Sequence, residues 1–207
     1  LAEVVDTITS FRYVQTSYNS RDLVPYYKME ILRSVVNSSA RQHLTNESFW
    51  TIGHTFYSTA LTSLGNPSRR DDSLIHIAEK GFYMCTSNLL SHMPSTIKGD
   101  VSDDRDIATI GLPCVMKAVG FLVAKLMKLA VPSGNGTTKS ARSDLETREL
   151  LIVVKALKVL IHGDGNVSHA QQTLLGCPSL ATMIRDELGK CLLFIAADRG
   201  FPQEVLE

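Results

Sequence analysis

Apolar residues recur every three or four positions along most of this chain, and this helical spacing constrains the fold more than any other feature. Gly, Pro, Asn and Ser interrupt the spacing at intervals, and these residues end helices and form turns. No convincing run alternates apolar and polar residues as a half-buried strand would. The pattern predicts seven helices, at about 1–9, 21–37, 46–64, 71–92, 112–130, 144–162 and 179–197.

The predicted helices have lengths that suit stacked helix pairs. A helix of 20 residues is about 30 Å long, and such helices can pair antiparallel across turns. We therefore expect an all-α fold, and within that class an α-solenoid of stacked antiparallel helix pairs of the armadillo or HEAT kind. No repeat consensus is visible in the letters, so the solenoid prediction rests on the order of helices and turns.

Residues 95–110 differ in character from both flanks. They contain Ser95, Gly99 and an acidic run at Asp100, Asp103, Asp104 and Asp106. Such a composition is typical of a linker or an exposed loop. The sequence therefore predicts two helical units, 1–94 and 111–207, joined by a linker at 95–110.

The charge balance speaks against binding to nucleic acid, and the hydropathy speaks against a membrane span. The 207 residues include 21 basic and 21 acidic side chains, whereas nucleic-acid binders usually carry a basic excess. We therefore expect no nucleic-acid partner. The most apolar run, 118–131, is interrupted by Lys125 and Lys128, and a membrane span needs about 20 apolar residues.

The cysteines bear on the cellular compartment. Cys85, Cys114, Cys177 and Cys191 are scattered and form no C-x-x-C pair, which favours buried thiols in a reducing, cytosolic compartment over a disulfide framework. Four Asn-x-Ser/Thr sequons leave secretion as an alternative, although so short a pattern recurs by chance. Leu1 already belongs to a helical pattern, so we expect this sequence to be a piece of a longer protein.

No catalytic, cofactor-binding or metal-binding pattern stands out. Residues 134–140, Gly-Asn-Gly-Thr-Thr-Lys-Ser, look like a phosphate loop, but such a loop needs Gly directly before its Lys and a strand ahead of it. The six histidines include no pair at i+4 and no H-E-x-x-H motif. The aspartates of 103–106 lack the glycine and the glutamate of a calcium loop. We therefore expect no enzyme, no cofactor and no metal.

Two regions are candidates for an interface. Lys117, Lys125 and Lys128 make the fifth predicted helix basic, so it could face anionic lipid or an acidic partner, although a solvated face is the simpler interpretation. Aromatic residues are enriched in interface cores, which points to the second and third helices around Tyr26, Tyr27 and Phe49. Packing in the core is the alternative role for these rings.

Several short motifs stand in a fixed order along the chain. The first stretch contains Ser10-Phe11-Arg12-Tyr13, a helix at 28–36, His43-Leu44-Thr45-Asn46-Glu47-Ser48 and Leu89-Leu90-Ser91-His92-Met93-Pro94. The second contains Gly111-Leu112-Pro113-Cys114, a helix with Val119-Gly120-Phe121-Leu122, and a predicted helix at 180–192 with Arg185-Asp186-Glu187 at its centre. In their order and spacing these motifs resemble the region upstream of the catalytic domain in the large Golgi Arf guanine-nucleotide exchange factors of the GNOM/Gea type.

The resemblance implies a dimerisation and cyclophilin-binding domain at 1–94 and the start of the homology-upstream region at 111–207, both built of α-solenoid layers. It implies a non-catalytic regulatory region that self-associates as a homodimer and binds small GTPases of the Arf or Rab type. It further implies a role in Golgi vesicle traffic, in the cytosol and peripherally at Golgi membranes. The glutamate loop of the exchange domain, Pro-Gly-Glu, does not occur in these residues.

Two other interpretations remain open. A helical-repeat adaptor or tether in membrane transport, unrelated to exchange factors, predicts the same fold and differs in the domain that follows in the full-length protein. A small helical enzyme would require a pocket with two close titratable residues whose pKa values are shifted.

Overall fold

The computed structural model describes residues 2–11, 23–66, 70–91, 112–130 and 143–162, together with four separate positions between 182 and 189. These residues form α1 (Ala2–Ser10), α2 (Val24–Asn37), the 3-10 helix η1 (Ser39–His43), α3 (Asn46–Leu64), α4 (Asp72–Ser91), α6 (Leu112–Ala130) and α7 (Asp144–His162). No strand occurs in these ranges, so the prediction of an all-helical fold is confirmed for them. The predicted linker 95–110, the loop 134–140 and all but four positions of the predicted helix 179–197 lie outside the described residues.

Local capping explains where three of the helices begin. Thr45 precedes α3, and its side-chain oxygen accepts a hydrogen bond from the Ser48 amide at 3.1 Å. Asp71 accepts from the amides of the second and third residues of α4 in the same way. Ser143 and Glu146 form a reciprocal capping box at the start of α7, with bonds of 3.2 Å and 2.9 Å. These caps satisfy amides that have no partner within the helix.

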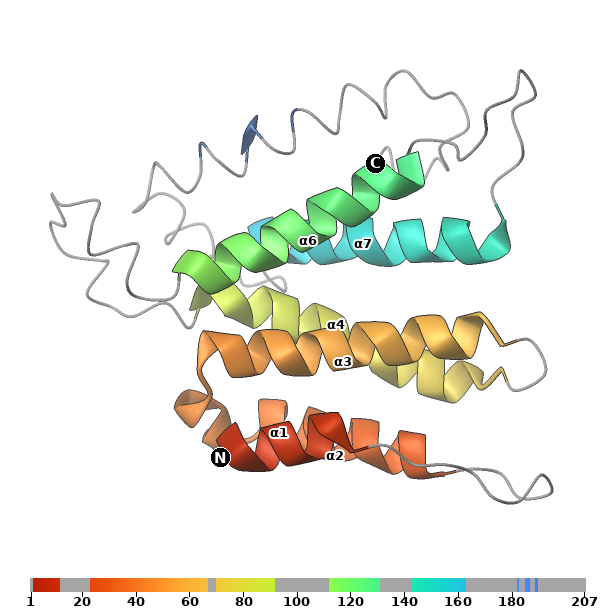
Figure 1. Ribbon diagram of the computed structural model, residues 1–207. Coiled ribbons are helices and arrows are strands. Elements are labelled where there is room, and N and C mark those ends of the chain that lie inside the picture. Colours follow the sequence, from red (N-terminus) through yellow and green to blue (C-terminus); the bar gives the residue numbers. More distant parts are fainter. Residues whose placement is uncertain are drawn as a thin grey trace, which may run out of the picture.

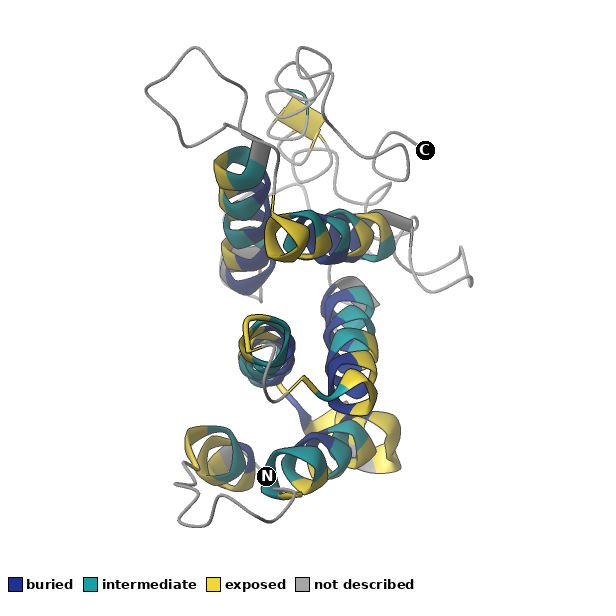
Figure 2. Cartoon of the chain, turned by 90° about the vertical axis from the view of Figure 1, so that its right-hand side faces the viewer, coloured by how far each residue is buried: buried dark blue, intermediate teal, exposed yellow. Residues whose placement is uncertain are grey.

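The helices form three roughly antiparallel pairs, which are α1 with α2, α3 with α4, and α6 with α7 (Figure 1). The first members, α1, α3 and α6, lie next to one another in one layer, and the second members, α2, α4 and α7, form the other (Figures 1 and 2). The buried surfaces of the helices face one another between the two layers (Figure 2). Amphipathic helices stack in this way because each must cover its apolar stripe.

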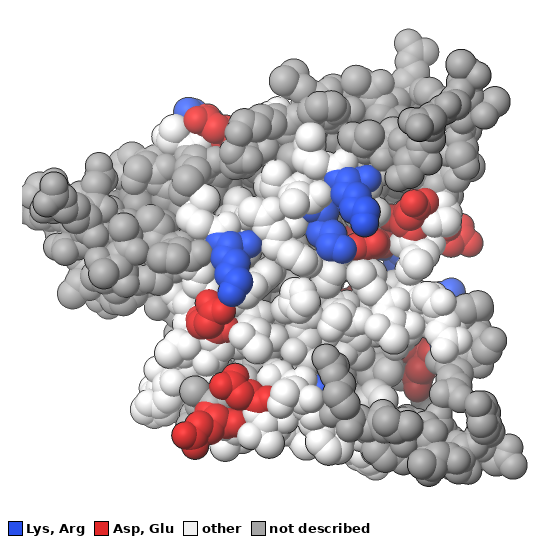
Figure 3. All heavy atoms as spheres, viewed as in Figure 1, with Lys and Arg blue, Asp and Glu red and all other residues white. Residues whose placement is uncertain are grey.

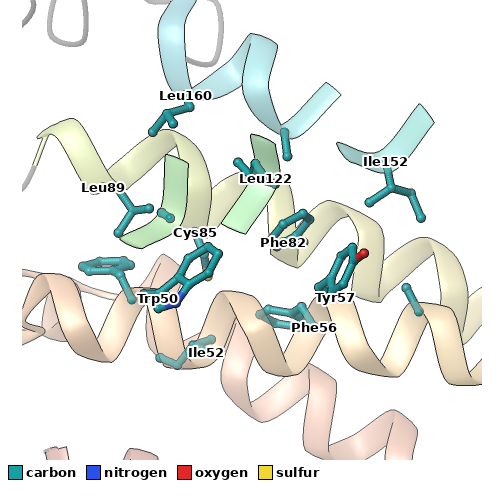
Figure 4. Packing of buried hydrophobic residues seen from close by; sticks show 14 of the residues in the cluster. Trp50, Ile52, Phe56, Tyr57, Phe82, Cys85, Leu89, Leu122, Ile152 and Leu160 are labelled. Carbon is teal, nitrogen blue, oxygen red and sulfur yellow. The ribbon is translucent and has the colours of Figure 1, made fainter. Parts of the chain in front are cut away.

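A single cluster of buried side chains runs through all six α-helices. Phe49, Ile52 and Phe56 contribute from α3, and side chains of α4, α6 and α7 complete the cluster around them (Figure 4). The cluster therefore continues from helices before residue 94 into helices after residue 111. The division of the chain into units 1–94 and 111–207 stays a prediction, but a shared core joins the helices on either side of it.

α3 and α4 lie very close to each other at Gly81 of α4. A Cβ atom at this position would lie 2.5 Å from two ring carbons of Phe56, which is fully buried. Gly53 of α3 is a second such position, where a Cβ would lie 3.0 Å from that of Cys85. Glycine is unfavourable within helices, so its presence here follows from the space between the two helices.

We predict that Gly81→Ala lowers the free energy of unfolding by about 1–3 kcal/mol, because the ring of Phe56 has to move within a filled core. Urea denaturation followed by circular dichroism measures the change. Gly120→Ala on α6 is the matched control, since nothing lies within 4 Å of the place its methyl group would take, and the better helix propensity of Ala raises stability by about 0.5–1 kcal/mol. Equal effects of the two substitutions would contradict the close packing of α3 on α4.

Candidate interaction surface

One side of α6 carries the three lysines and one aromatic ring. Lys117, Phe121, Lys125 and Lys128 share this face because they are spaced by about one, two and three helical turns. Lys117 and Lys128 are exposed, whereas Phe121 and Lys125 are half-buried against neighbouring helices. The three lysines therefore do not form one uniform basic patch.

Phe121 joins α6 to α3 through an aromatic cluster. Its ring centroid lies 5.4 Å from Trp50, 5.3 Å from His54 and 5.3 Å from Tyr57, with interplanar angles of 71°, 70° and 86°. Edge-to-face contacts of this kind are favourable beyond the burial of area. The three α3 residues project toward α6 because they are three or four positions apart.

Lys125 belongs to a polar junction of three helices. Its Nζ lies 3.3 Å from Glu149 Oε1 of α7, and the same oxygen accepts a hydrogen bond of 2.5 Å from the Tyr57 hydroxyl of α3. The ammonium also lies 5.7 Å from the centre of the Tyr57 ring and 5.8 Å from that of Phe121. Burial, followed by the bond to Glu149, raises the pKa of Tyr57 far above its ordinary value. Lys125 thus holds helices together and offers little charge to a partner.

Lys117 pairs with Glu47 at the start of α3. The Nζ–Oε1 distance is 2.7 Å, and both side chains are more than half exposed. The hydrogen bond from Lys117 lowers the pKa of Glu47, and the same bond raises the pKa of Lys117. Exposed pairs of this kind contribute roughly 0–1 kcal/mol, so a partner that supplies another carboxylate can share or displace the pair.

An open groove of about 470 Å³ lies between α1, α3 and α6. Its lining includes Thr9 and Ser10 of α1, Trp50 and His54 of α3, and Lys117 and Phe121 of α6. Burial, then the charges of Lys125 and Lys117, lower the pKa of His54 below its usual 6.5. The imidazole is therefore neutral at pH 7, and the floor of the groove is mostly uncharged.

The residues predicted on the second and third helices occupy different environments. Phe49 is fully buried in the core of this chain, which matches the alternative role in core packing, and its interface role stays a prediction. Tyr27 is 57% exposed and Tyr26 is half-buried, and their rings meet edge to face at 5.9 Å. Ile31, one turn beyond Tyr27, is also exposed. α2 therefore carries a small apolar patch at Tyr27 and Ile31.

The groove has three titratable lining residues, which are Glu47, His54 and Lys117. Glu47 and Lys117 are both shifted toward their charged forms, as an ion pair requires, whereas a general acid or base needs a pKa near the working pH. Burial raises the pKa of the neighbouring Cys114 thiol to about 12, the opposite of an activated nucleophile. Among the described residues, no three His, Cys, Asp or Glu side chains gather where they could bind a metal ion.

Comparison of the chain with models of known protein families, with curated proteins and with solved structures found no match. Within the described ranges, none of the helices combines the length and the apolar character needed to cross a membrane.

Sequence reasoning found the lysines of α6 but missed the residues that pair with them. Phe121 lies midway between Lys117 and Lys125 at i+4 from each, and Trp50 and His54 have the same spacing on α3, so these two faces could have been read from the sequence. The role of Glu149 could not have been read from the sequence, because its contacts with Tyr57 and Lys125 depend on how three helices pack.

We predict that His54 makes the fold less stable in mild acid. The unfolded chain binds a proton near pH 6.5, whereas burial and two nearby lysines disfavour the charged imidazole in the fold. The free energy of unfolding is therefore highest above pH 6.5, the pKa of the unfolded chain. It decreases as the pH falls from 6.5 to the lower pKa that His54 has in the folded state. NMR titration should give a pKa below 6.5 for His54, and Lys117→Met should raise that pKa toward 6.5. A value at or above 6.5 in the native chain would contradict this environment.

Proposed function

We propose that this chain is a non-catalytic regulatory and self-association region of an Arf guanine-nucleotide exchange factor that acts in Golgi vesicle traffic. The observation that carries the proposal is the ordered series of motifs, from Ser10-Phe11-Arg12-Tyr13 through Gly111-Leu112-Pro113-Cys114 to the segment 180–192. The all-helical fold of the described residues agrees with what such a region requires. In this proposal the protein is cytosolic and attaches peripherally to Golgi membranes.

We further propose that the helix pairs are layers of an α-solenoid. Each pair contacts the next in both layers, through α1 with α3 and α2 with α4, and then through α3 with α6 and α4 with α7 (Figure 1). Solenoids are built in this way, since each unit is stabilised by its neighbours and leaves long outer faces for partners. The proposed partners are a second copy of the chain, small GTPases of the Arf or Rab type, and an anionic membrane surface in peripheral contact.

The exposed large apolar side chains of the described residues are Val4, Phe11, Leu23, Tyr27, Ile31 and Leu145. Tyr27 and Ile31 form the apolar patch of α2, and Lys117 and Lys128 are the exposed cations of α6. Basic and acidic side chains lie close together on the face that Figure 3 shows. An aromatic residue beside an aliphatic one suits the centre of a protein interface, where tyrosine is enriched. The lysines suit a rim or an anionic surface.

We expect the purified chain to self-associate in sedimentation velocity runs and to retain Arf or Rab GTPases in pull-downs, with GDP-loaded and GTP-analogue-loaded forms compared. Tyr27→Ala should weaken at least one of these interactions about tenfold and leave unfolding unchanged, because the side chain is mostly exposed. Thr7→Ala on α1 is a control at another exposed position.

Strictly monomeric behaviour with no GTPase binding would contradict the proposal. An independent outcome comes from the residues that follow this sequence in the full-length protein. An exchange domain with its glutamate loop supports the proposal, whereas a different domain favours a helical adaptor or tether unrelated to exchange factors.

A further inference from the structure

The basic helix to which the sequence points is largely neutralised within the fold. On α6, Lys117 pairs with Glu47 at 2.7 Å. Lys125 of the same helix pairs with Glu149 at 3.3 Å. Of the three lysines of α6, Lys128 alone has no such pair with another described residue. A partner attracted by positive charge therefore finds little of it on α6.

Three exposed lysines in the other layer keep their charge. They are Lys80 of α4 and Lys155 and Lys158 of α7, and none of them forms an ion pair with another described residue. α4 and α7 therefore carry more unpaired positive charge than α6 does.

The three lysines lie along the contact between α4 and α7, which are neighbours in one layer (Figure 1). The Lys155 Nζ lies 4.7 Å from the centre of the Tyr83 ring of α4, and Lys80 comes one turn before Tyr83. Lys158 comes one turn after Lys155 on α7. We call Lys80, Lys155 and Lys158 the lysine strip.

The acidic side chains around the lysine strip have partners of their own. Glu79 of α4 pairs with Arg148 at 3.3 Å, and its side chain is only 13% exposed. Asp72 of α4 and Glu30 of α2 each pair with an arginine of their own segment. The acidic residues of α7 lie in its first two turns, more than two turns before the lysines of that helix, apart from the half-buried Glu149. The lysine strip is thus open to carboxylates from outside the chain.

Apolar side chains border the lysine strip. Leu151 is half-buried and precedes Lys155 and Lys158 by one and two turns on the same face of α7. The half-buried ring of Tyr83 lies beneath the Lys155 ammonium. Apolar contacts beside a charged pair exclude water from it, which strengthens the pair.

We propose that the lysine strip binds an acidic segment of a partner protein. Carboxylates of the segment pair with the three lysines, and an apolar side chain packs on Leu151 and Tyr83. A lysine ammonium is a point charge on a flexible stem, so it accepts carboxylates at several spacings, where the rigid fork of an arginine would not. This binding does not depend on the chain being part of an exchange factor.

An acidic segment fits the lysine strip better than an anionic membrane does. A flat bilayer against this layer would also meet α2, which lies beside α4 (Figure 1). Glu30 and Arg33 of α2 pair with each other at 3.0 Å and contribute no net charge. Positive charge confined to two adjacent helices matches a narrow ligand, and charge complementarity along such a ligand sets its register.

Fluorescence anisotropy with a fluorescein-labelled peptide of Glu-Glu-Leu repeats tests the lysine strip, with a Gln-Gln-Leu peptide of equal length as the uncharged control. The native chain should bind only the acidic peptide, and more weakly as salt is raised. K80E and K155E, one on each helix, should each weaken binding at least about fivefold, because repulsion replaces attraction. R41E is the matched control and should bind like the native chain, since Arg41 is exposed on η1, which packs against α2.

Far-UV circular dichroism and urea denaturation establish that each variant is folded, and all three substituted positions are exposed. A native chain that binds neither peptide would overturn the proposal. Equal weakening by K80E, K155E and R41E would also overturn it, because net charge alone would then explain the binding. Flotation with phosphatidylcholine vesicles, with and without phosphatidylserine, distinguishes a lipid ligand. Binding to the phosphatidylserine vesicles that K155E removes, without binding to the acidic peptide, would assign the strip to lipid and contradict the proposed partner.

Discussion

The fold depends on the broad apolar face of α4, because this helix contacts members of all three pairs. Buried residues at Leu74, Ala78, Phe82, Cys85 and Leu89 follow the helical period and place nearly every turn of α4 in the core. α4 packs against α3, its pair, and against α2 and α7 of its own layer. Burial of apolar surface contributes roughly 25 cal/mol per Å², so a helix covered on three sides contributes strongly to stability. The positions of α2 and α7 follow from this constraint.

Polar contacts between helices fix how the helices are oriented around the apolar core. Glu149 accepts from Tyr57 and pairs with Lys125, and it thereby fixes α3, α6 and α7 relative to one another. Glu79 of α4 pairs with Arg148 of α7 at 3.3 Å. Nearby, Lys155 lies 4.7 Å from the centre of the Tyr83 ring. Lys125 and Glu149 are half-buried between the helices, whereas Arg148 and Lys155 are exposed.

The sequence predicts the secondary structure well because the signals are local. Each described α-helix begins and ends within about three residues of its predicted bounds, since caps and turn residues act over one turn, whereas the 3-10 helix η1 was not predicted. Side-chain burial depends on the packing between helices and is harder to read. Phe49 illustrates the difference. From the sequence alone, an aromatic residue at the start of a helix suits an interface or a core equally, and in the structure Phe49 is buried in the core. Phe121 is the opposite case, since its role as the centre of an aromatic cluster required the position of α3 beside α6.

A regulatory scaffold needs a rigid core and exposed faces that can be covered at low cost. The hydroxyl-rich face of α3 meets the second need, because its hydroxyls donate to carbonyls of their own helix. The apolar patch of α2 lies outside that face and leaves room for a different partner.

The central claim is that the three helix pairs share one core and unfold as one body. Native-state hydrogen exchange followed by mass spectrometry measures this for each helix. A shared core predicts that the slowest amides of α3, α4 and α7 exchange with the same opening free energy, equal to that of global unfolding. If α7 opens at a much lower free energy while α3 and α4 stay protected, the pairs are separate units and the shared core is contradicted.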